Sequence, residues 1–141
     1  MTTSLSLPQS ANLTTSIAFS SEIDLSEGAA LYTQLDLREE LFASQMALAA
    51  SVSQQVEMAR SIIGAKKVTK SIMLSEYNWK EDQYTCLNRL WTKESHWNYK
   101  ARNKRSGAHG IPQALPASRM DVISTDWRTN PVTQIRWGLR Y

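Results

Sequence analysis

Cysteine, glycine and proline are scarce in this 141-residue sequence, which contains one, five and four of them respectively. The single cysteine, Cys86, excludes an internal disulfide framework and any zinc site built from several cysteines. The longest unbroken apolar run is MALAA at 46–50, far short of the roughly 20 residues that a membrane-spanning helix needs. No Lys or Arg precedes Arg38, so the sequence shows no recognisable secretory signal peptide.

Charge and aromatic residues are distributed unevenly along the chain. Residues 1–59 contain one basic and seven acidic residues, whereas residues 60–141 contain fifteen basic and six acidic residues, a balance of +9. All five tryptophans lie in this second part. Hydrophobic residues make up 42% of the chain, which argues against wholesale disorder. A basic surface favours polyanionic partners, which include nucleic acids and anionic cell-wall polymers, and charge alone does not choose between them.

The first part of the chain predicts a disordered segment over residues 1–28 and a long amphipathic helical region over 29–75. Eleven of the first 26 residues are Ser or Thr, and they show no apolar periodicity. A seven-residue spacing of apolar side chains then begins, at Leu35, Phe42, Ala49, Val56 and Ile63. We expect one helix from residue 29 to about 63, with Ser26 as its N-cap and Gly64 as its stop.

The apolar stripe of this helix needs a partner surface. Arg38 and Gln45 interrupt the neighbouring row of the heptad pattern, which weakens a strict coiled-coil seam. The stripe can dock on the C-terminal domain or on a second copy of the chain, and the sequence leaves both arrangements open.

Residues 76–141 predict short helices joined by loops, so the predicted fold class is all-α. Apolar residues at helical spacing indicate a helix from Glu81 to about Trp97. Residues 98–109 are too rich in Asn, Lys, Arg, Ser and Gly to continue it. The Asn130-Pro131 pair is typical of a helix entry, so a final helix is expected over 132–141. Three tryptophans are expected in the core, namely Trp79, Trp127 and Trp137.

Glu94 is the candidate catalytic group. It lies within LWTKESHWN at 90–98, near the end of a predicted helix and between two tryptophans. A glutamate held against aromatic groups loses hydration of its charged form, so we expect its pKa to be raised. A carboxylic acid that stays protonated near neutral pH can donate a proton to a leaving oxygen.

The segment SGAHGIPQALP at 106–116 follows twelve residues after Glu94. Its glycines Gly107 and Gly110 permit tight turns and close approach of a ligand to the backbone. Gln113 offers a donor and acceptors, which suits the amide and hydroxyl groups of an N-acetyl sugar. Near the end of the chain, the Gly138-x-x-Tyr141 pattern presents a tyrosine about one helical turn beyond a glycine.

These segments, in this order, resemble the lytic transglycosylase family, whose fold is similar to goose-type lysozyme. The helix-ending Glu94-Ser95 pair, the Gly-Ala-x-Gly-Ile-x-Gln pattern and the final Gly-x-x-Tyr match three motifs of that family. The closest likeness is to the actinobacterial type, with Cys-Leu-x-x-Leu-Trp before the acid and Gly-Ile-Pro-Gln-Ala-Leu-Pro after it. The resemblance covers residues 76–141. Relatives continue beyond the final motif, so it implies a lysozyme-like domain that is partial at its C-terminal end.

The resemblance implies that Glu94 is the single acid/base that cleaves between N-acetylmuramic acid and N-acetylglucosamine and leaves a 1,6-anhydro ring. It implies that Gln113 and Tyr141 line the cleft, with the Tyr141 hydroxyl steadying the Glu94 carboxyl. Ser95 is expected to brace the helix end or touch substrate, and Trp97 either stacks on a sugar or is buried. The expected partners are peptidoglycan glycan strands and anionic wall polymers, and the expected location is extracellular, at the cell wall.

Several alternatives remain open at this stage. Hydrolysis usually needs a second carboxylate, and only Asp121 or Asp126 could fold toward Glu94 to supply one. A non-catalytic wall-binding or structural protein is the second candidate function. A nucleic-acid binder is not favoured, because the Trp, Lys and Arg residues match no recognised module. The spacings of the two histidines and the cysteine match no common zinc pattern, so we expect neither a metal nor a cofactor.

Overall fold

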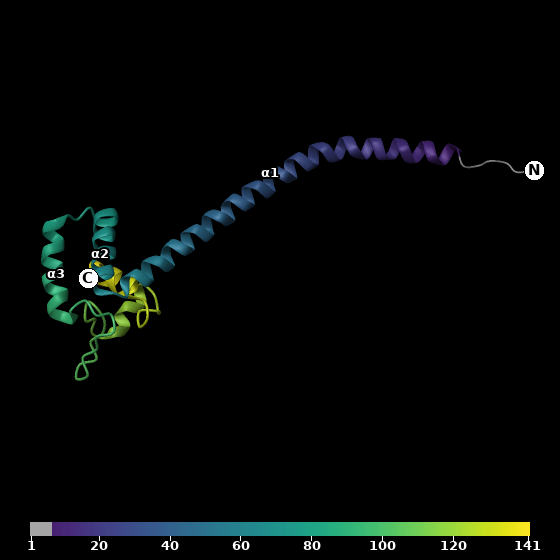
Figure 1. The fold of residues 1–141 in the computed structure, drawn as a ribbon. Helices are drawn as coiled ribbons and strands as arrows, with labels where there is room; N and C mark the ends of the chain where they lie inside the picture. Colours follow the sequence, from purple (N-terminus) through teal and green to yellow (C-terminus); the bar gives the residue numbers. More distant parts are fainter. Residues whose placement is uncertain (1–6) are drawn as a thin grey trace, which may run out of the picture. The chain divides into compact units, whose positions relative to one another are not determined.

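The computed structural model describes the backbone of residues 7–141 and the side chains from Ser26 onward. Five helical elements follow one another along the chain (Figure 1): α1 (Leu7–Ala59), α2 (Ile62–Tyr77), α3 (Glu81–Ser95), the 3₁₀ helix η1 (Ala117–Val122) and α4 (Pro131–Arg140). Within the described residues, extended pairing is confined to isolated bridges in the loop between α3 and η1. The predicted all-α class is confirmed.

The chain divides into two compact units, residues 1–48 and 49–141. The first unit holds most of α1, which begins at Leu7, so Ser26 lies inside the helix and is not its N-cap. The predicted disorder of residues 1–28 is not confirmed: residues 1–6 lie outside the described part, and the backbone from Leu7 onward is helical. Once nucleated, a helix adds one internal hydrogen bond per residue, so a Ser/Thr-rich segment can extend it without an apolar stripe.

Among residues 26–48, the large apolar side chains of α1 are exposed. Leu35 and Phe42, two members of the predicted stripe, are 44% and 64% exposed. In the second unit, Val56 is half-buried and Ala59 is buried, so the last turn of α1 joins the core. Whether the rest of the stripe packs on another surface stays a prediction. No helix among the described residues has the length and apolar content needed to cross a membrane.

The boundary between α1 and α2 differs from the predicted one. The helix was expected to stop at Gly64, but it breaks at residues 60–61 and Gly64 lies in the first turn of α2. Ser61 caps the new helix, because its Oγ accepts a hydrogen bond from the Gly64 N–H at 3.0 Å. A Cβ on Gly64 would overlap the carbonyl oxygen of Met58. The glycine is therefore required by the close approach of the two helix ends.

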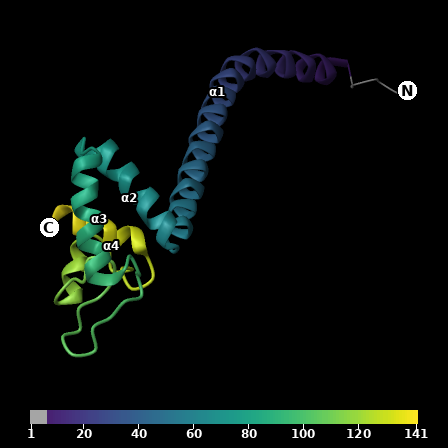
Figure 2. The ribbon, with the colours of Figure 1, turned by 60° about the vertical axis from the view of Figure 1, so that its left-hand side comes forward.

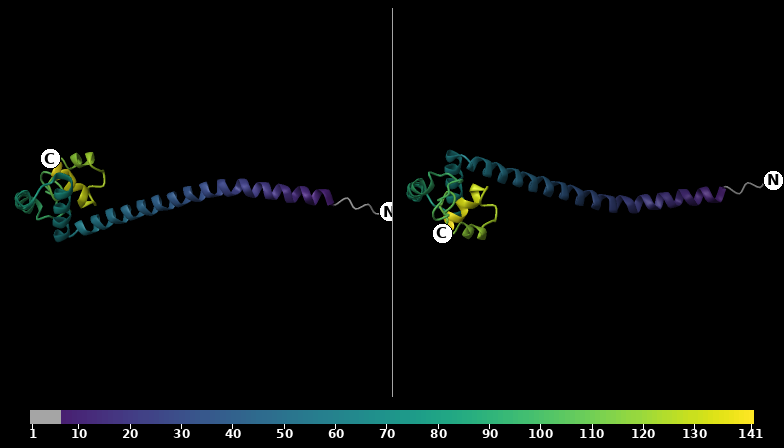
Figure 3. Two further views of the ribbon diagram at one scale, coloured as in Figure 1. Left: turned by 90° about the horizontal axis from the view of Figure 1, so that it is seen from above. Right: turned by 90° about the horizontal axis from the view of Figure 1, so that it is seen from below.

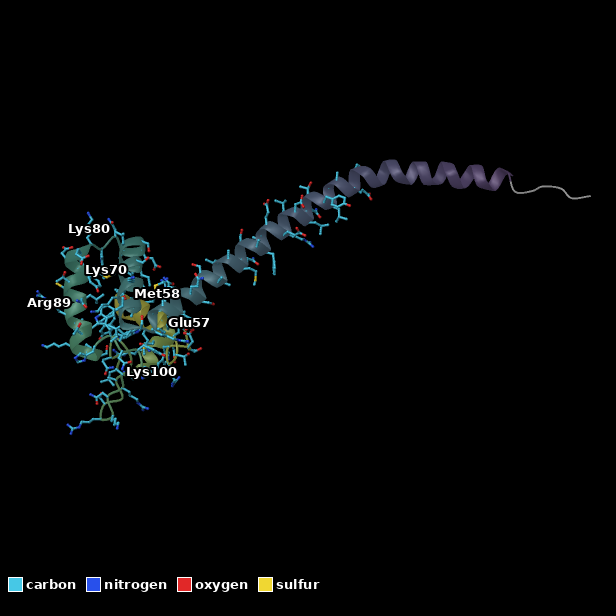
Figure 4. All side chains as sticks on the ribbon, viewed as in Figure 1. Glu57, Met58, Lys70, Lys80, Arg89 and Lys100 are labelled. Atoms are coloured by element: carbon cyan, nitrogen blue, oxygen red, sulfur yellow. The ribbon has the colours of Figure 1, made fainter. Side chains whose placement is uncertain are left out.

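The second unit is built around α2, which packs against both α3 and α4 (Figure 2). Lys70 links α2 to α3, because its Nζ lies 3.0 Å from a carboxylate oxygen of Glu81 and 4.2 Å from the ring centroid of Tyr84. Lys70 is labelled between the two helices in Figure 4. The main core cluster is apolar and includes the buried indoles of Trp91 and Trp97, whose centroids are 5.0 Å apart.

A smaller cluster lies where η1 packs against α4 (Figure 3). It contains Met120, Trp127 and Trp137, all buried. Two of the three tryptophans predicted for the core are therefore there. The third prediction is wrong: Trp79 is 36% exposed and packs on the ring of Tyr77, because it lies in the short link between α2 and α3. The free thiol of Cys86 is exposed.

The predicted bounds of α3 and α4 agree well with the structure. α3 ends two residues before the predicted end, because His96 adopts the left-handed conformation that terminates helices. α4 begins at Pro131, and the side chain of Asn130 accepts hydrogen bonds from the backbone N–H groups of Val132 and Thr133.

Replacing Gly64 with alanine should destabilise the second unit. Alanine inside a helix is normally favoured over glycine by about 1 kcal/mol, but here its Cβ must displace the Met58 carbonyl. We expect the free energy of unfolding to fall by about 1–3 kcal/mol, measured by urea denaturation followed by tryptophan fluorescence. Gly28→Ala is the matched control, because nothing lies within 4 Å of its added Cβ. Equal stability of the two variants would contradict this explanation of the helix break.

Candidate functional site

A surface cavity of about 450 Å³ lies where α3, the loop after it and α4 meet. We call it the groove. It is lined by Leu90, Trp91, Glu94, Pro112, Gln113, Leu115, Arg119, Trp137, Gly138 and Tyr141. The three motif segments singled out in the sequence therefore contribute to one cavity. Glu94, Gln113 and Tyr141, three of the five predicted site residues, are among the lining residues.

The side-chain amide of Gln134 holds the loop against α4. Gln134 is fully buried, and its Oε1 accepts a hydrogen bond from the Ile111 N–H at 3.0 Å. Its Nε2 donates to the carbonyl oxygens of Tyr99 at 3.0 Å and Trp127 at 2.7 Å. One amide therefore satisfies three backbone groups from separate segments. No local sequence pattern indicates this role, because none of the three partners lies within one helical turn of Gln134 in the sequence.

Gly110 allows the loop to approach this amide. Its φ of +80° is disfavoured for residues with a side chain, and an added Cβ would overlap the amide of Gln134. The loop then folds back on itself, since His109 and Ala114 exchange two backbone hydrogen bonds of 3.1 and 3.0 Å. We call residues 109–114 the hairpin. Its tip presents Pro112 and Gln113 to the groove.

Ser95 joins the end of α3 to this hairpin. The side chain is buried, and its Oγ donates to the Ile111 carbonyl oxygen at 2.8 Å, with the Trp91 carbonyl oxygen 3.3 Å away. Ser95 therefore braces the helix end, one of the two roles that the sequence left open. It is not among the groove residues, whereas the neighbouring Glu94 is. The brace fixes the position of Glu94 relative to the hairpin.

Trp97 does not line the groove. Only 2% of it is exposed, and its Nε1 donates to Asn88 Oδ1 at 3.0 Å. The backbone at His96 and Trp97 has positive φ, so the chain reverses and turns the indole into the core beside Trp91. Of the two roles predicted for Trp97, stacking on a sugar is therefore wrong, and burial in the core is confirmed.

The Trp91 indole, from α3, lies against Gly138 of α4 and forms the floor of the groove. A Cβ on Gly138 would lie 2.6 Å from Cζ2 of Trp91, so only glycine lets the indole lie this close to the backbone of α4. Trp137 and Tyr141 stack with ring centroids 4.9 Å apart and planes 18° from parallel. The Tyr141 ring is 84% exposed. Within the described residues its hydroxyl makes no hydrogen bond to Glu94, so the expected steadying contact is absent.

Glu94 stands at the rim of the groove, on the last turn of α3. The sequence predicted a carboxyl group sheltered by aromatic neighbours, but Glu94 is exposed. The reason is the direction of the two indoles, because Trp91 and Trp97 are both buried in the core and do not cover the carboxylate. In the described part of the chain Glu94 has neither a hydrogen-bond nor an ion-pair partner.

Gln113 is held in one orientation. Its Nε2 donates to the carbonyl oxygens of Gly110 at 2.8 Å and Ala101 at 3.2 Å. Both donors of the amide are therefore used by the loop, and the Oε1 atom has no partner in the described structure. Gln113 can therefore accept a hydrogen bond from a hydroxyl or amide group bound in the groove.

Arg119 was not predicted as a site residue. It belongs to η1, lines the groove and makes no ion pair with any described carboxylate. No local sequence pattern indicates that Arg119 is a site residue, because only the fold of the segment after Pro116 brings this side chain to the groove. One carboxylate, one guanidinium, one amide and one phenol thus surround an apolar floor, a combination suited to a polar ring-shaped ligand.

Asp121 and Asp126 are both committed elsewhere. Asp121 accepts a hydrogen bond of 2.6 Å from Nε1 of Trp127. Asp126 accepts hydrogen bonds from Thr133 Oγ1 at 2.7 Å and Asn130 Nδ2 at 2.8 Å. Burial raises the pKa of Asp126, but hydrogen bonds from Asn130, Thr133 and Ser124 outweigh it and hold the pKa below its usual value. Glu94 is therefore the sole carboxylate among the groove residues.

Neither histidine is placed to complete a metal site. Among the described residues, no three His, Cys, Asp or Glu side chains form a group that could hold a metal ion. His96 ends α3 at the surface, and His109 packs edge-to-face on Trp127.

Replacing Gln134 with methionine should weaken the fold and open the groove. Methionine has similar volume but leaves the Ile111 N–H and two carbonyl oxygens without partners, each at a cost of about 1–3 kcal/mol. We expect the free energy of unfolding to fall by about 3 kcal/mol or more, measured by chemical denaturation. Arg136→Met on the same helix removes only an exposed ion pair with Glu76 and should cost under about 1 kcal/mol. Similar losses from both variants would contradict the assigned role of Gln134.

Comparisons of the chain with protein-family models, curated proteins and solved structures find no match. The likeness to lytic transglycosylases therefore depends on the motif residues, and function must be argued from the groove itself.

Proposed function

We propose that the groove binds a glycan strand of peptidoglycan and cleaves the bond between N-acetylmuramic acid and N-acetylglucosamine as a lytic transglycosylase. One observation carries the proposal: Glu94, Gln113 and Tyr141 come from three separate segments and line one cavity, in which Glu94 is the sole carboxylate. The chemistry needs one group that first gives and then takes a proton, and Glu94 can supply both steps.

In the proposed reaction, the protonated Glu94 carboxyl donates its proton to the bridging oxygen as the bond from that oxygen to C1 of the muramic acid breaks. The C6 hydroxyl oxygen of the same sugar then attacks C1, and its proton passes to the Glu94 carboxylate. The products are a glycan end with a free 4-hydroxyl and a 1,6-anhydro ring. Glu94 ends the cycle protonated, and water is not consumed.

The positions of the Asp121 and Asp126 carboxylates support this route over hydrolysis. Glycoside hydrolases usually place a second carboxylate about 5–10 Å from the acid, as nucleophile or as base for water. Asp121 and Asp126 are held by Trp127 and by the start of α4, and neither lines the groove. In the proposed route a hydroxyl of the substrate replaces water as the nucleophile, and Glu94 itself accepts the proton of that hydroxyl, so a second carboxylate is not needed.

The remaining groove residues suit sugar binding. The apolar floor under Trp137 and Leu115 can pack against the carbon face of a sugar ring. Gln113 Oε1 can accept from an N-acetyl N–H, and Arg119 can donate to a carbonyl or carboxylate oxygen. The balance of +9 over residues 60–141 favours attraction to an anionic wall. We therefore propose the cell wall as the place of action.

A non-catalytic wall-binding protein is the second candidate. The exposure of Glu94 and its lack of a partner in the described structure favour this alternative, because no described side chain shelters the carboxyl group from water. Such a protein would bind glycan strands in the same groove but release no product.

Glu94→Gln should abolish the reaction. The amide keeps the size of the side chain but neither donates nor accepts the proton, so we expect turnover to fall by about 10²-fold or more. The measurement is release of anhydro-muropeptides from purified peptidoglycan, detected by mass spectrometry. Glu81→Gln on the same helix, at an exposed ion pair, is the control and should retain activity. Equal product from the Glu94→Gln variant would remove Glu94 from the mechanism, and binding without product from the unmodified protein would favour the second candidate.

The product should carry no oxygen from solvent. Because the C6 hydroxyl is the proposed nucleophile, digestion in ¹⁸O-labelled water should yield unlabelled 1,6-anhydro ends, about 20 mass units lighter than the ¹⁸O-labelled reducing ends that hydrolysis would leave. The released fragments are measured by mass spectrometry, and peptidoglycan digested in parallel by a hydrolytic muramidase provides the labelled reference. Reducing ends that contain ¹⁸O would show that water attacks C1, and would make Asp121 and Asp126 candidates for the second carboxylate.

A further inference from the structure

A second cavity, of about 320 Å³, shares none of its lining residues with the groove. We call it the basic cavity. It lies at the base of the hairpin, and its lining residues include Arg102, His109, Ser118, Trp127 and Arg128. No carboxylate is among its lining residues, and both arginines are exposed there.

The two guanidinium groups of the basic cavity are unpaired. Neither Arg102 nor Arg128 makes an ion pair with a carboxylate of the described residues. Arg128 is nonetheless held in place, because its guanidinium carbon lies 4.0 Å from the centroid of the Trp127 ring. A stacked arginine keeps its N–H edge free and loses little conformational entropy when it binds an anion.

His109 lines the basic cavity together with both arginines. Its ring packs edge-to-face on Trp127, 5.1 Å between centroids, and bridges Arg102 through the backbone. Burial lowers the pKa of His109, and the positive charges of Arg102 and then Arg128 lower it further. The Nε2 atom is buried and has no hydrogen-bond partner among the described residues. The half-buried ring therefore forms a polar wall of the basic cavity beside two arginines without ion-pair partners in the described structure.

The two acidic residues nearest to Arg128 in the sequence, Asp126 and Asp121, are held by other partners. Asp121 accepts a hydrogen bond from the Trp127 indole N–H, and Asp126 accepts hydrogen bonds from Thr133 and Asn130. Each carboxylate already accepts strong hydrogen bonds, so moving either one would leave a buried or capping donor without its partner. The positive charge of the basic cavity therefore has no neutralising partner among the described residues.

We propose that the basic cavity is a binding site for an oxyanion, a carboxylate or phosphate group, held by the guanidinium groups of Arg102 and Arg128 with the hydroxyl of Ser118 beside them. Arginine presents paired N–H groups that match the two oxygens of such an anion. This site is independent of glycan cleavage in the groove, so either proposal can fail without the other.

The experiment is a titration of the full chain with inorganic phosphate and, separately, with acetate, followed by NMR at constant ionic strength maintained with chloride. We expect saturable shifts at the backbone amides around residues 102, 109 and 128. We also expect the pKa of His109, read from its ring protons, to rise when anion binds, because the bound negative charge offsets both arginines. Chloride-insensitive, saturable binding supports the site.

Substitutions assign the binding to the two arginines. Arg102→Met and Arg128→Met should each weaken phosphate binding about tenfold or more, as expected for loss of a charge-assisted hydrogen bond. Arg119→Met, which removes a cation from the groove instead, is the matched control and should bind phosphate normally. If Arg128→Met fails to fold, Arg128→Lys keeps the charge without the paired N–H edge and should bind with intermediate strength.

Two further ligands distinguish the natural source of the oxyanion. N-acetyl-D-alanine presents the free carboxylate of a peptide, and glycerol 1-phosphate presents the phosphate of a polyol polymer. The better competitor against inorganic phosphate identifies the class. Absence of saturable binding by any of the four anions would overturn the proposal. Binding that Arg102→Met and Arg128→Met both leave unchanged, or a His109 pKa that phosphate does not move, would overturn it as well.

Discussion

The groove depends on one buried hydrogen-bonding group, the side-chain amide of Gln134. A buried amide is stable only when its donors and acceptor are satisfied, and here all three partners are backbone groups from other segments. The same bonds fix the chain near Tyr99, the hairpin at Ile111 and the turn at Trp127 relative to α4. Ser95 adds a fourth link, from the end of α3 to Ile111. Glu94 and Gln113 line the same groove because these hydrogen bonds position their segments, and the two side chains do not bond to each other in the described structure.

The packing of the Trp91 indole on Gly138 explains why the polar groups stand at the rim. No side chain at position 138 fits beneath this indole, and the resulting floor is apolar. The charged and amide groups therefore come from positions just outside this contact: the last turn of α3, the hairpin tip and η1. Exposure of Glu94 is the consequence, because the tryptophans beside it in sequence fill the core and do not shield it.

Local signals predicted the helices well and the site partly. The capping residue Asn130, the proline after it and the spacing of apolar residues in α3 act within one or two turns, so sequence alone located both helices. The helix break near Gly64 could not be predicted, because the glycine is required by a contact with Met58 that exists only after folding. For the same reason Gln134 and Arg119 were missed: their roles depend on segments that are brought to them by the tertiary structure.

The hairpin contributes residues to both cavities. Its tip contributes Pro112 and Gln113 to the groove, whereas His109 at its base lines the basic cavity. Two backbone hydrogen bonds between His109 and Ala114 make the hairpin a stiff unit, and the Gln134 amide holds its middle at Ile111. These bonds hold the tip and the base of the hairpin in one conformation through backbone groups and the Gln134 amide. The two cavities therefore share one structural support, although they share no lining residue.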